Sequence, residues 1–336
     1  MKKAGKALNK DFLYKTFFTF VTFITFFTLH AYSASFSNSA RGTTTAQFLK
    51  LGPGARAIAM GEAHTALVAD SQAIYWNPAA LSRSPKHSMS MMHAPYLESM
   101  YFDWVSYSIN TRNLGAFGIG AQYFNAGKID RRDNAGVKIG NFTPTDYSVS
   151  FAYAKETSAI GEMFMSEMFG GYSLGIAFKL VRSEIVASDS AMTFDLGMLA
   201  PLVLDKFRFG LAMQNIGGKL TFDEKPSSLP FVFRAGVATK TDGWWTLAMD
   251  AVFQKDNRPG VALGAERKFY PSVMNPDLMF NLRGGMNSRF FGQNIGGIGG
   301  GSLGFGILWK AMSFDYAISP MGNLGLTHRT SMSFAF

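Results

Sequence analysis

The chain has 336 residues, of which 47% are hydrophobic and only 16% charged, with a formal net charge of +9, 35 Gly, 32 Phe and no Cys. Soluble domains carry roughly 25% charged residues and disordered chains are poor in aromatic side chains, so the composition fits neither class. It also excludes a disulfide framework, thiolate metal sites and a bundle of membrane helices, since no uncharged apolar run approaches the ~20 residues that a helix needs to cross a bilayer. Low charge with many aromatic and Gly residues is typical of a membrane β-barrel.

Residues 1–33 predict a cleaved secretory signal peptide. A basic start is followed by the uncharged run 16–29 and by the small residues Ala31 and Ser33, which is the order found in such signals. The alternative is an uncleaved anchor helix, but the run is short for that role. Without residues 1–33, which hold five Lys and one Asp, 27 basic and 22 acidic residues remain and the net charge falls to +5. The basic balance therefore does not indicate a nucleic-acid partner.

Residues 34–86 do not alternate in polarity, and they predict a short, partly helical hatch in front of a barrel. Pro53 suits the start of a helix through Met60, and Gly61 ends it. Asn77 suits a helix cap directly before Pro78, which restricts the residue before it to extended conformations. We expect this apolar segment to lie in the barrel lumen as a plug. The residues of its predicted motif are Arg56, Gly61, Asn77, Pro78 and Ala79.

From about residue 88 onward, short segments alternate between large apolar and small or polar residues. In 147–153, for example, Tyr, Val, Phe and Tyr alternate with Ser, Ser and Ala. Successive side chains of a strand point to opposite faces, so each segment predicts a strand with one apolar face. The fourteen segments are 88–94, 100–110, 114–124, 145–154, 172–183, 191–199, 206–216, 231–239, 244–253, 259–268, 279–287, 302–309, 312–318 and 327–336; the first two are the least regular.

These segments predict an all-β fold: a transmembrane antiparallel β-barrel of about 14 strands over 87–336, with the hatch in its lumen. A soluble β-sandwich or lipocalin-like barrel also alternates, but its polar face would be rich in Lys and Glu. Here that face is mostly Gly, Ala and Ser. An even number of strands allows both chain ends to lie on one side of the membrane.

Eight charged residues share the small-residue face of their strands: Lys179, Asp195, Arg208, Arg234, Asp250, Glu266, Arg283 and Asp315. A charge on the lipid face costs ~2–4 kcal/mol near the midplane, so we expect these side chains to point into the lumen. Buried ions need partners. We therefore favour ion pairs with one another and with the hatch, where Arg56 is a candidate partner, over a solute-binding ladder.

The C-terminal strand and the loop lengths predict how the barrel is assembled and oriented. Phe334 and the terminal Phe336 share one face of the last segment, which resembles the signal read by the outer-membrane barrel assembly machinery. If the N-terminus is periplasmic, the short turns 201–206, 240–243 and 310–311 face the periplasm and the longer loops 125–144 and 292–301 face outward, which is the usual arrangement. The connection 154–171 is an exception, since it is long yet periplasmic; its Met and Phe residues could form a small amphipathic helix.

No catalytic, metal or cofactor site is expected. His64, His87, His93 and His328 lack any ligand spacing. Gly299-x-Gly301-x-x-Gly304 matches a dinucleotide fingerprint, but it runs into an alternating segment rather than a helix. We therefore do not expect an enzyme.

The segment FLKLGPGARAIAMGEAHTALVADSQAIYWNPAAL (48–81) and the C-terminal LGLTHRTSMSFAF (324–336) resemble the PorV/PorQ family of outer-membrane proteins, which are themselves similar to FadL-type transporters. The resemblance covers nearly all of the mature chain, although Ala69-Asp70-Ser71 lacks a second acidic residue and Ala80 stands where Gly is common. It implies a fourteen-stranded barrel with an N-terminal hatch.

What the resemblance implies for function is transport or protein secretion across the outer membrane, with FadL-like passage of long-chain fatty acids or other hydrophobic small molecules as the alternative. The partners it implies are outer-membrane lipid, the barrel assembly machinery, and secreted cargo proteins or hydrophobic ligands. A general solute pore is disfavoured, because the hatch would obstruct it.

Overall fold

The computed structural model describes residues 36–111, 113–157, 171–203, 206–222, 225–241, 244–271, 277–291 and 299–336. The predicted signal peptide, most of the connection 154–171 and most of the glycine-rich loop 292–301 lie outside these residues. The short helices are η1 (Asn38–Ala40), η2 (Gln47–Lys50), α2 (Ala55–Ala59), α3 (Ala73–Trp76), η3 (Pro78–Arg83), η4 (Leu97–Ser99), η6 (Ser288–Phe290) and η7 (Gly322–Leu324). None of the described helices is long and apolar enough to cross a bilayer.

Fourteen antiparallel strands form one closed barrel, as the alternation predicts. They are β1 (His87–Pro95), β2 (Tyr101–Thr111), β3 (Gly115–Asn125), β6 (Thr145–Glu156), β7 (Ser173–Glu184), β8 (Ser188–Leu199), β9 (Phe207–Ile216), β12 (Val232–Thr241), β13 (Trp245–Gln254), β14 (Gly260–Phe269), β15 (Leu278–Asn287), β16 (Gly301–Trp309), β17 (Met312–Pro320) and β18 (Leu326–Ala335). Strand β18 pairs with β1 and closes the barrel, with Ser88 opposite Ala335. The two least regular segments are complete strands, β1 and β2, paired over their length.

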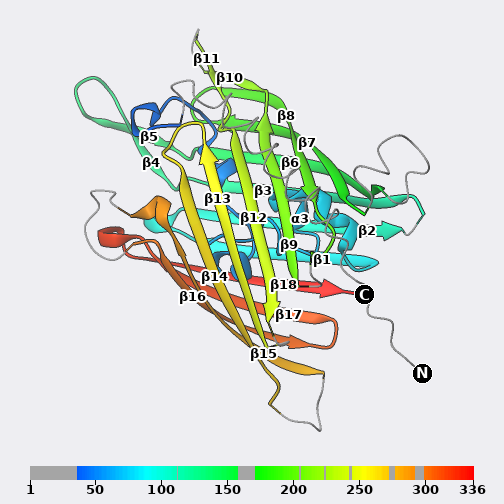
Figure 1. The fold of residues 1–336 in the computed structure, drawn as a ribbon. Coiled ribbons are helices and arrows are strands. Elements are labelled where there is room, and N and C mark those ends of the chain that lie inside the picture. The colour runs from blue at the N-terminus through cyan, green and yellow to red at the C-terminus, as the bar shows by residue number, and fades with distance from the viewer. Residues whose placement is uncertain are drawn as a thin grey trace, which may run out of the picture.

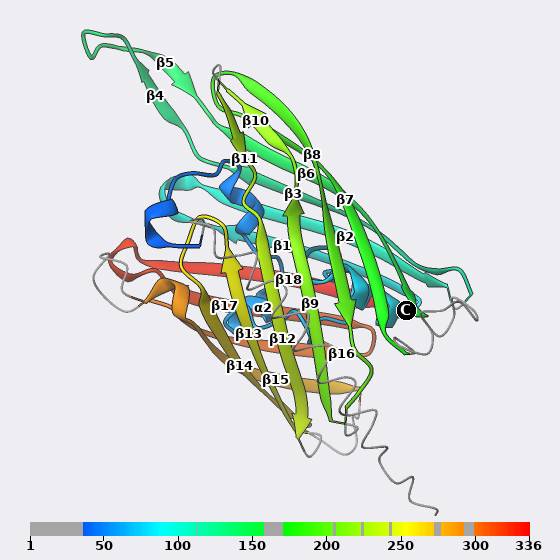
Figure 2. The ribbon, with the colours of Figure 1, turned by 45° about the horizontal axis from the view of Figure 1, so that its top comes forward.

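Two further hairpins were not expected from the alternation. Strands β4 (Ile129–Arg132) and β5 (Lys138–Phe142) pair within the charged loop, and β10 (Lys219–Thr221) pairs with β11 (Pro226–Ser228). Both hairpins project from the end of the barrel opposite the C-terminus (Figures 1 and 2). Strands β4 and β5 carry exposed charged residues and have no buried apolar face. Large apolar and polar residues therefore do not alternate along them.

The strands present an apolar face outward and a small or polar face inward. In β7, Ile176, Phe178 and Leu180 are exposed, whereas Ala177 and Lys179 between them are buried. An outward apolar face suits contact with lipid tails. The same alternation therefore determines which side chains enter the lumen.

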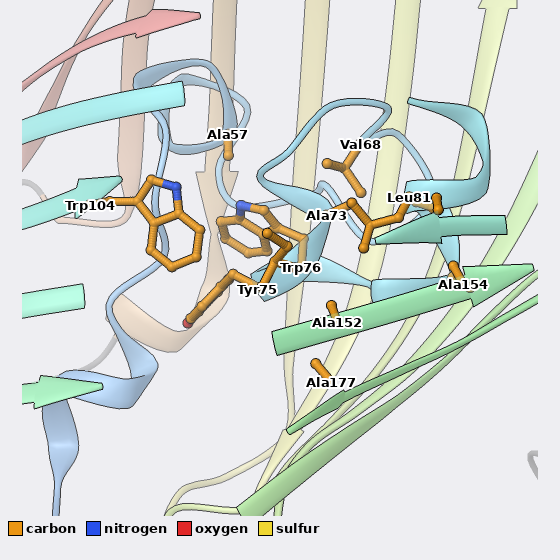
Figure 3. Close-up of a cluster of buried hydrophobic side chains, with 14 of the residues drawn as sticks. Ala57, Val68, Ala73, Tyr75, Trp76, Leu81, Trp104, Ala152, Ala154 and Ala177 are labelled. Carbon is orange, nitrogen blue, oxygen red and sulfur yellow. The ribbon is translucent and has the colours of Figure 1, made fainter. Parts of the chain in front are cut away.

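Residues 44–84, here called the luminal segment, fill the lumen. Tyr75, Trp76 and Leu81 of this segment are almost completely buried. Together with Trp104 and Ala152 from the barrel wall they belong to one apolar cluster (Figure 3). Among the described residues, the largest fully buried side chains thus come both from the luminal segment, as with Trp76 and Tyr75, and from the inner face of the wall, as with Arg234 and Phe102.

Glycines on the inner face of the wall let the luminal segment approach the strands closely. A Cβ at Gly175 would lie 2.3 Å from the backbone N of Ala79, and one at Gly285 would lie 2.1 Å from the N of Gly61. Ordinary side chains would collide there. The wall and the luminal segment therefore touch through their backbones at these points.

Candidate functional site: the luminal segment and its contacts with the wall

Helix α2 ends in a turn that requires Gly61. The Gly61 N–H donates to the carbonyl of Ile58, and the Glu62 N–H donates to that of Ala57, both at 2.9 Å. These two hydrogen bonds are the usual end of a helix when the residue after it adopts a left-handed conformation. Gly61 is that residue, with a φ of +65°. A Cβ at Gly61 would also lie 2.6 Å from the carbonyl oxygen of Leu263. Gly61 thus ends the helix and seats it against the wall.

Arg56 of helix α2, which is partly exposed, begins a chain of ion pairs along the wall whose other members are buried. Its Nε and Nη2 donate to the two carboxylate oxygens of Glu266 in β14 at 2.8 and 2.9 Å. Arg283 in β15 donates to the same Glu266 at 2.7 Å and to Asp315 in β17 at 2.6 Å. The expected partner of Arg56 is therefore Glu266, and this chain of alternating charges joins the luminal segment to three strands.

Asn77 both caps helix η3 and joins it to its surroundings. Its Oδ1 accepts the N–H of Ala79 at 3.2 Å, and Pro78 stands at the first position of the helix. Its Nδ2 donates to the carbonyls of Thr65 at 3.0 Å and Met198 at 3.2 Å. The Asn77 side chain therefore connects two parts of the luminal segment to strand β8.

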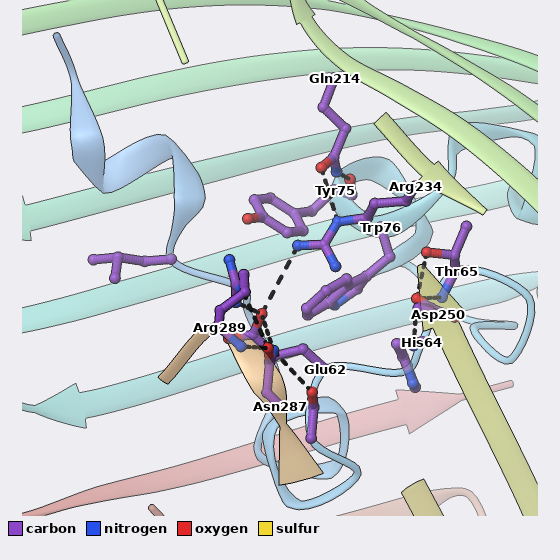
Figure 4. A network of polar contacts seen from close by, with 12 residues as sticks. Glu62, His64, Thr65, Tyr75, Trp76, Gln214, Arg234, Asp250, Asn287 and Arg289 are labelled. Carbon is purple, nitrogen blue, oxygen red and sulfur yellow. Dashed lines mark hydrogen bonds and ion pairs between the residues drawn. The ribbon is translucent and has the colours of Figure 1, made fainter. Parts of the chain in front are cut away.

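Three of the other predicted inward charges contact the luminal segment or each other, and Arg208 differs from them. Asp250 accepts the backbone N–H groups of His64 and Thr65 and the Thr65 hydroxyl, the last at 2.6 Å (Figure 4). Lys179 pairs with Asp195 at 2.6 Å, and both side chains are buried. Arg208 is half-buried, and its Nε meets no hydrogen-bond partner among the described residues.

A second charged cluster surrounds Glu62. Its carboxylate pairs with Arg289, lies 3.8 Å from Arg234 and accepts from the amide of Asn287 at 3.4 Å. The Arg234 guanidinium lies over the ring of Trp76, 4.9 Å from its centroid. Figure 4 shows these side chains converging from the luminal segment and the wall.

Sequence reasoning missed Glu62 and Arg289 of this cluster, and it also missed the buried Arg329, which contacts Tyr96. Arg329 alternates with the outward-facing His328 and Thr330 in β18, so the period-two pattern contained its signal. Glu62 and Arg289 lie in turns, where alternation carries no information.

Asp256 holds the first part of the luminal segment to the loop between β13 and β14. Thr44, Gln47 and Lys50 donate to its carboxylate, with Lys50 at 2.9 Å. Burial alone would raise the pKa of Asp256. The hydrogen bonds from Thr44, Lys50 and Gln47 outweigh burial and hold that pKa below its usual range.

Phe336 lies at the seam where the barrel closes. Its ring stacks on that of His87 with a centroid distance of 5.2 Å, and the two residues exchange backbone hydrogen bonds of 2.8 and 3.0 Å. Phe334 is paired with Met89 of β1. The two aromatic residues of the predicted assembly signal thus belong to the closing strand pair.

In the parts of the chain that the structure describes, no group of three His, Asp or Glu residues is close enough to hold a metal ion. His93 instead pairs with Asp103 at 2.7 Å, and His328 bonds to Tyr316 at 2.7 Å.

The family model described as "Type IX secretion system protein PorV" matches residues 35–272, which is more than half of the chain. The chain belongs to the PorV family. The match includes the luminal segment and the strands from β1 to β14. A search of curated proteins found no significant match.

Solved structures of similar fold at low sequence identity include a FadL homologue, a hydrocarbon channel and a toluene transporter. A Pseudomonas aeruginosa FadL homologue has a TM-score of 0.54 at 10% identity, covering 88% of this chain and 98% of its own. The CymD monoaromatic hydrocarbon channel has a TM-score of 0.54 at 12% identity, covering 85% of this chain and 98% of its own. The Pseudomonas putida toluene transporter TodX has a TM-score of 0.50 at 12% identity, covering 85% of this chain and 98% of its own. At these identities the likeness concerns the fold, which is that of the FadL-like barrels.

Proposed function

We propose that this outer-membrane barrel of the PorV family supports protein secretion through a type IX secretion system. The observation that carries the proposal is the family match over residues 35–272, which includes the segment that fills the lumen. A barrel whose lumen is filled and linked to its wall by buried ion pairs is suited to binding or escorting cargo at its surface rather than to conducting solutes.

The alternative, passage of hydrophobic small molecules, is favoured by one specific feature. The outer wall carries an apolar hollow of about 590 Å³ over strands β9 and β12–β15. Phe207, Leu247, Met249, Leu263 and Met286 line it. TodX, whose fold is similar, is named as a toluene transporter.

Deletion of the gene in its native host distinguishes the two functions. We expect proteins bearing type IX C-terminal signals to accumulate in the periplasm, with toluene uptake unchanged. Complementation with the wild-type chain controls for effects on neighbouring genes. Normal secretion together with lost toluene uptake would favour the alternative.

We also propose that the chain reaches the outer membrane after cleavage of residues 1–33, that residues 34–86 form its hatch domain, and that the assembly machinery reads its C-terminal strand. The family and the fold support an outer-membrane location. Mass spectrometry of the mature protein should find Ala34 at its N-terminus.

Deleting Phe336 tests the C-terminal signal. We expect fewer assembled barrels with export across the inner membrane intact. Normal barrel levels at modest expression would show that Phe336 serves only in packing against His87.

A further inference from the structure

The apolar hollow over β9 and β12–β15 has a floor of two small residues. Ala265 in β14 and Gly284 in β15 are paired directly across the two strands, and both line the hollow. Their neighbours Glu266 and Arg283 are buried and bind each other inside the barrel, so the two small residues face outward. Large apolar side chains, each between 41% and 48% exposed, stand around this floor: Leu247, Met249, Leu263 and Met286. The hollow is therefore a gap in the lipid-facing surface at two positions that lack a large side chain.

A cation lies beside the hollow, on the same face of the wall. Arg267 follows Ala265 two positions along β14 and is exposed. Strand β14 runs in the same direction as β18, so Arg267 lies toward the end of the barrel that carries the C-terminus. The exposed aromatic residues Trp244, Trp245 and Tyr270 lie at this end too, as in the aromatic girdles that mark a membrane interface. Arg267 therefore lies at the level of the lipid headgroups, and the hollow extends from it toward the middle of the membrane.

Two aromatic rings hold the Arg267 guanidinium but leave its charge without a counterion. The guanidinium carbon lies 5.0 Å from the ring centroid of Trp245 and 5.2 Å from that of Phe269. Arg267 makes no ion pair with any of the residues that the structure describes, and the carboxylate of the adjacent Glu266 is engaged on the luminal side. A guanidinium edge binds phosphate oxygens in pairs. An anion from the membrane can therefore reach the N–H groups of Arg267.

We propose that the hollow binds an acyl chain of a phospholipid whose phosphate is held by Arg267. Along β14 the four steps from Arg267 to Leu263 span about 13 Å, which is close to the ~15 Å depth of one leaflet of the hydrocarbon core. Neighbouring lipid tails are as apolar as the hollow itself, so packing there distinguishes weakly between lipids and the contact with Arg267 selects a phosphorylated one. The proposal is independent of the role in secretion, and it gives the hollow a resident lipid rather than a transported compound.

Native mass spectrometry of the barrel purified from outer membranes tests the site. The probe is phosphatidylglycerol with palmitoyl and oleoyl chains, and diacylglycerol with the same chains, which lacks the phosphate, is the reference. We expect one phosphatidylglycerol to bind ahead of all further lipids, and diacylglycerol to bind at least tenfold more weakly. Arg267→Gln should weaken binding of that first phosphatidylglycerol at least tenfold.

Lys310→Gln is the matched control for the loss of an interfacial cation. Lys310 is also exposed and also lies over an aromatic ring, 5.6 Å from the centroid of Trp309, in the β16–β17 turn at the same end of the barrel. It does not adjoin the hollow. We expect Lys310→Gln to bind phosphatidylglycerol as the wild type does. An equal loss in Lys310→Gln and Arg267→Gln would show general attraction to the interface and would overturn the site.

Gly284→Leu tests the hollow without changing any charge. A Cβ at Gly284 meets only a side-chain atom of Leu303 at 3.6 Å, so the variant is expected to fold, with its new side chain over the floor of the hollow. Binding of the first phosphatidylglycerol should weaken several-fold. Unchanged binding in Gly284→Leu or in Arg267→Gln, or equal binding of diacylglycerol by the wild type, would contradict the proposal. Toluene binding that is lost in Gly284→Leu while phosphatidylglycerol binding is kept would assign the hollow to a transported compound instead.

Discussion

The two sides of the barrel hold the luminal segment by different kinds of contact. On one side, helix η3 packs on β6, β7 and β8, where Gly175 and Gly197 admit its backbone and alanines surround it. On the other side, helix α2 packs on β15, β16 and β17 and reaches a chain of buried charges through Arg56. Glycines admit the backbone on both sides, as Gly285 does for the turn after helix α2, but only the side of helix α2 adds long side chains of opposite charge.

The difference predicts that loss of a charge destabilises the side of helix α2, whereas an added methyl group is the direct test of the side of helix η3. Contacts between backbones tolerate no added methyl group, because interiors are close-packed and have little room to relax. Ion pairs tolerate a change of shape more easily than a loss of charge, because removing one partner leaves the other buried and uncompensated. Substitutions on each side therefore test different physical causes.

The largest effect is expected from Glu266→Gln on the charged side. Glu266 accepts hydrogen bonds from both Arg56 and Arg283. Breaking a buried ion pair in this way costs ~3–5 kcal/mol. Thermal unfolding should show the lower stability, and single-channel recordings in planar bilayers should show higher conductance as the luminal segment loosens.

Glu184→Gln, at the exposed end of β7, is the control for the loss of a carboxylate. A double-mutant cycle with Arg56→Gln isolates the contact between helix and wall. Additive effects of Arg56→Gln and Glu266→Gln would show that this ion pair contributes no coupling between them.

A smaller effect is expected from Gly175→Ala on the apolar side. The new Cβ would lie 2.3 Å from the backbone N of Ala79, so helix η3 has to move away from β7. Overpacking of this kind costs ~1–3 kcal/mol. The melting temperature should fall relative to Gly284→Ala, the control, whose Cβ would meet only a side-chain atom of Leu303 at an ordinary 3.6 Å. Equal melting temperatures for the two variants would contradict close backbone contact at Gly175.

The sequence predicts the wall far better than it predicts the contacts inside it. Alternation reports which face of a strand a residue occupies, and it therefore identifies the fourteen strands and inward residues such as Lys179 and Glu266. It also distinguishes Gly175 and Gly285 as inward positions, but it does not say that a backbone passes directly against them. That information depends on how the luminal segment folds within the closed barrel.

Turn residues were predictable only where their own chemistry sets the conformation. Gly61 ends helix α2 and Asn77 caps helix η3, as the missing side chain of Gly61 and the amide of Asn77 suggest. Glu62 and Arg289 also lie in turns, but they act through partners more than 200 positions apart in the sequence. No local pattern encodes such a pair.

A still smaller effect is expected from Asn77→Ala. This substitution removes the cap of helix η3 without adding bulk or removing charge. The loss of a cap costs ~0.5–2 kcal/mol, and here the bonds to Thr65 and Met198 are lost as well. We expect normal outer-membrane levels, because this is too little to unfold a barrel, together with increased leakage of small solutes or altered cargo handling. Asn77→Asp retains an acceptor for the Ala79 N–H and should keep part of the effect of the cap. Permeability and cargo binding equal to those of the wild type would show that the motif is only a scaffold.

The smallest effect is expected at Asp256, which holds the start of the luminal segment to the loop between β13 and β14. The folded pKa of Asp256 is lower than normal, so its ionised carboxylate stabilises the fold above the unfolded-chain pKa of ~3.9. That contribution is lost as the pH falls through the lower folded pKa. Because the partner Lys50 is partly exposed, we expect Asp256→Asn to cost only ~0.5–1 kcal/mol near neutral pH.

Melting curves of the wild type and Asp256→Asn should therefore differ at pH 7 and converge as the pH falls below 4. Lys50→Gln should shrink the same difference, because it weakens the contact from the other partner. Curves that remain equally far apart at every pH would show that packing around Asp256, rather than its charge, holds this part of the luminal segment.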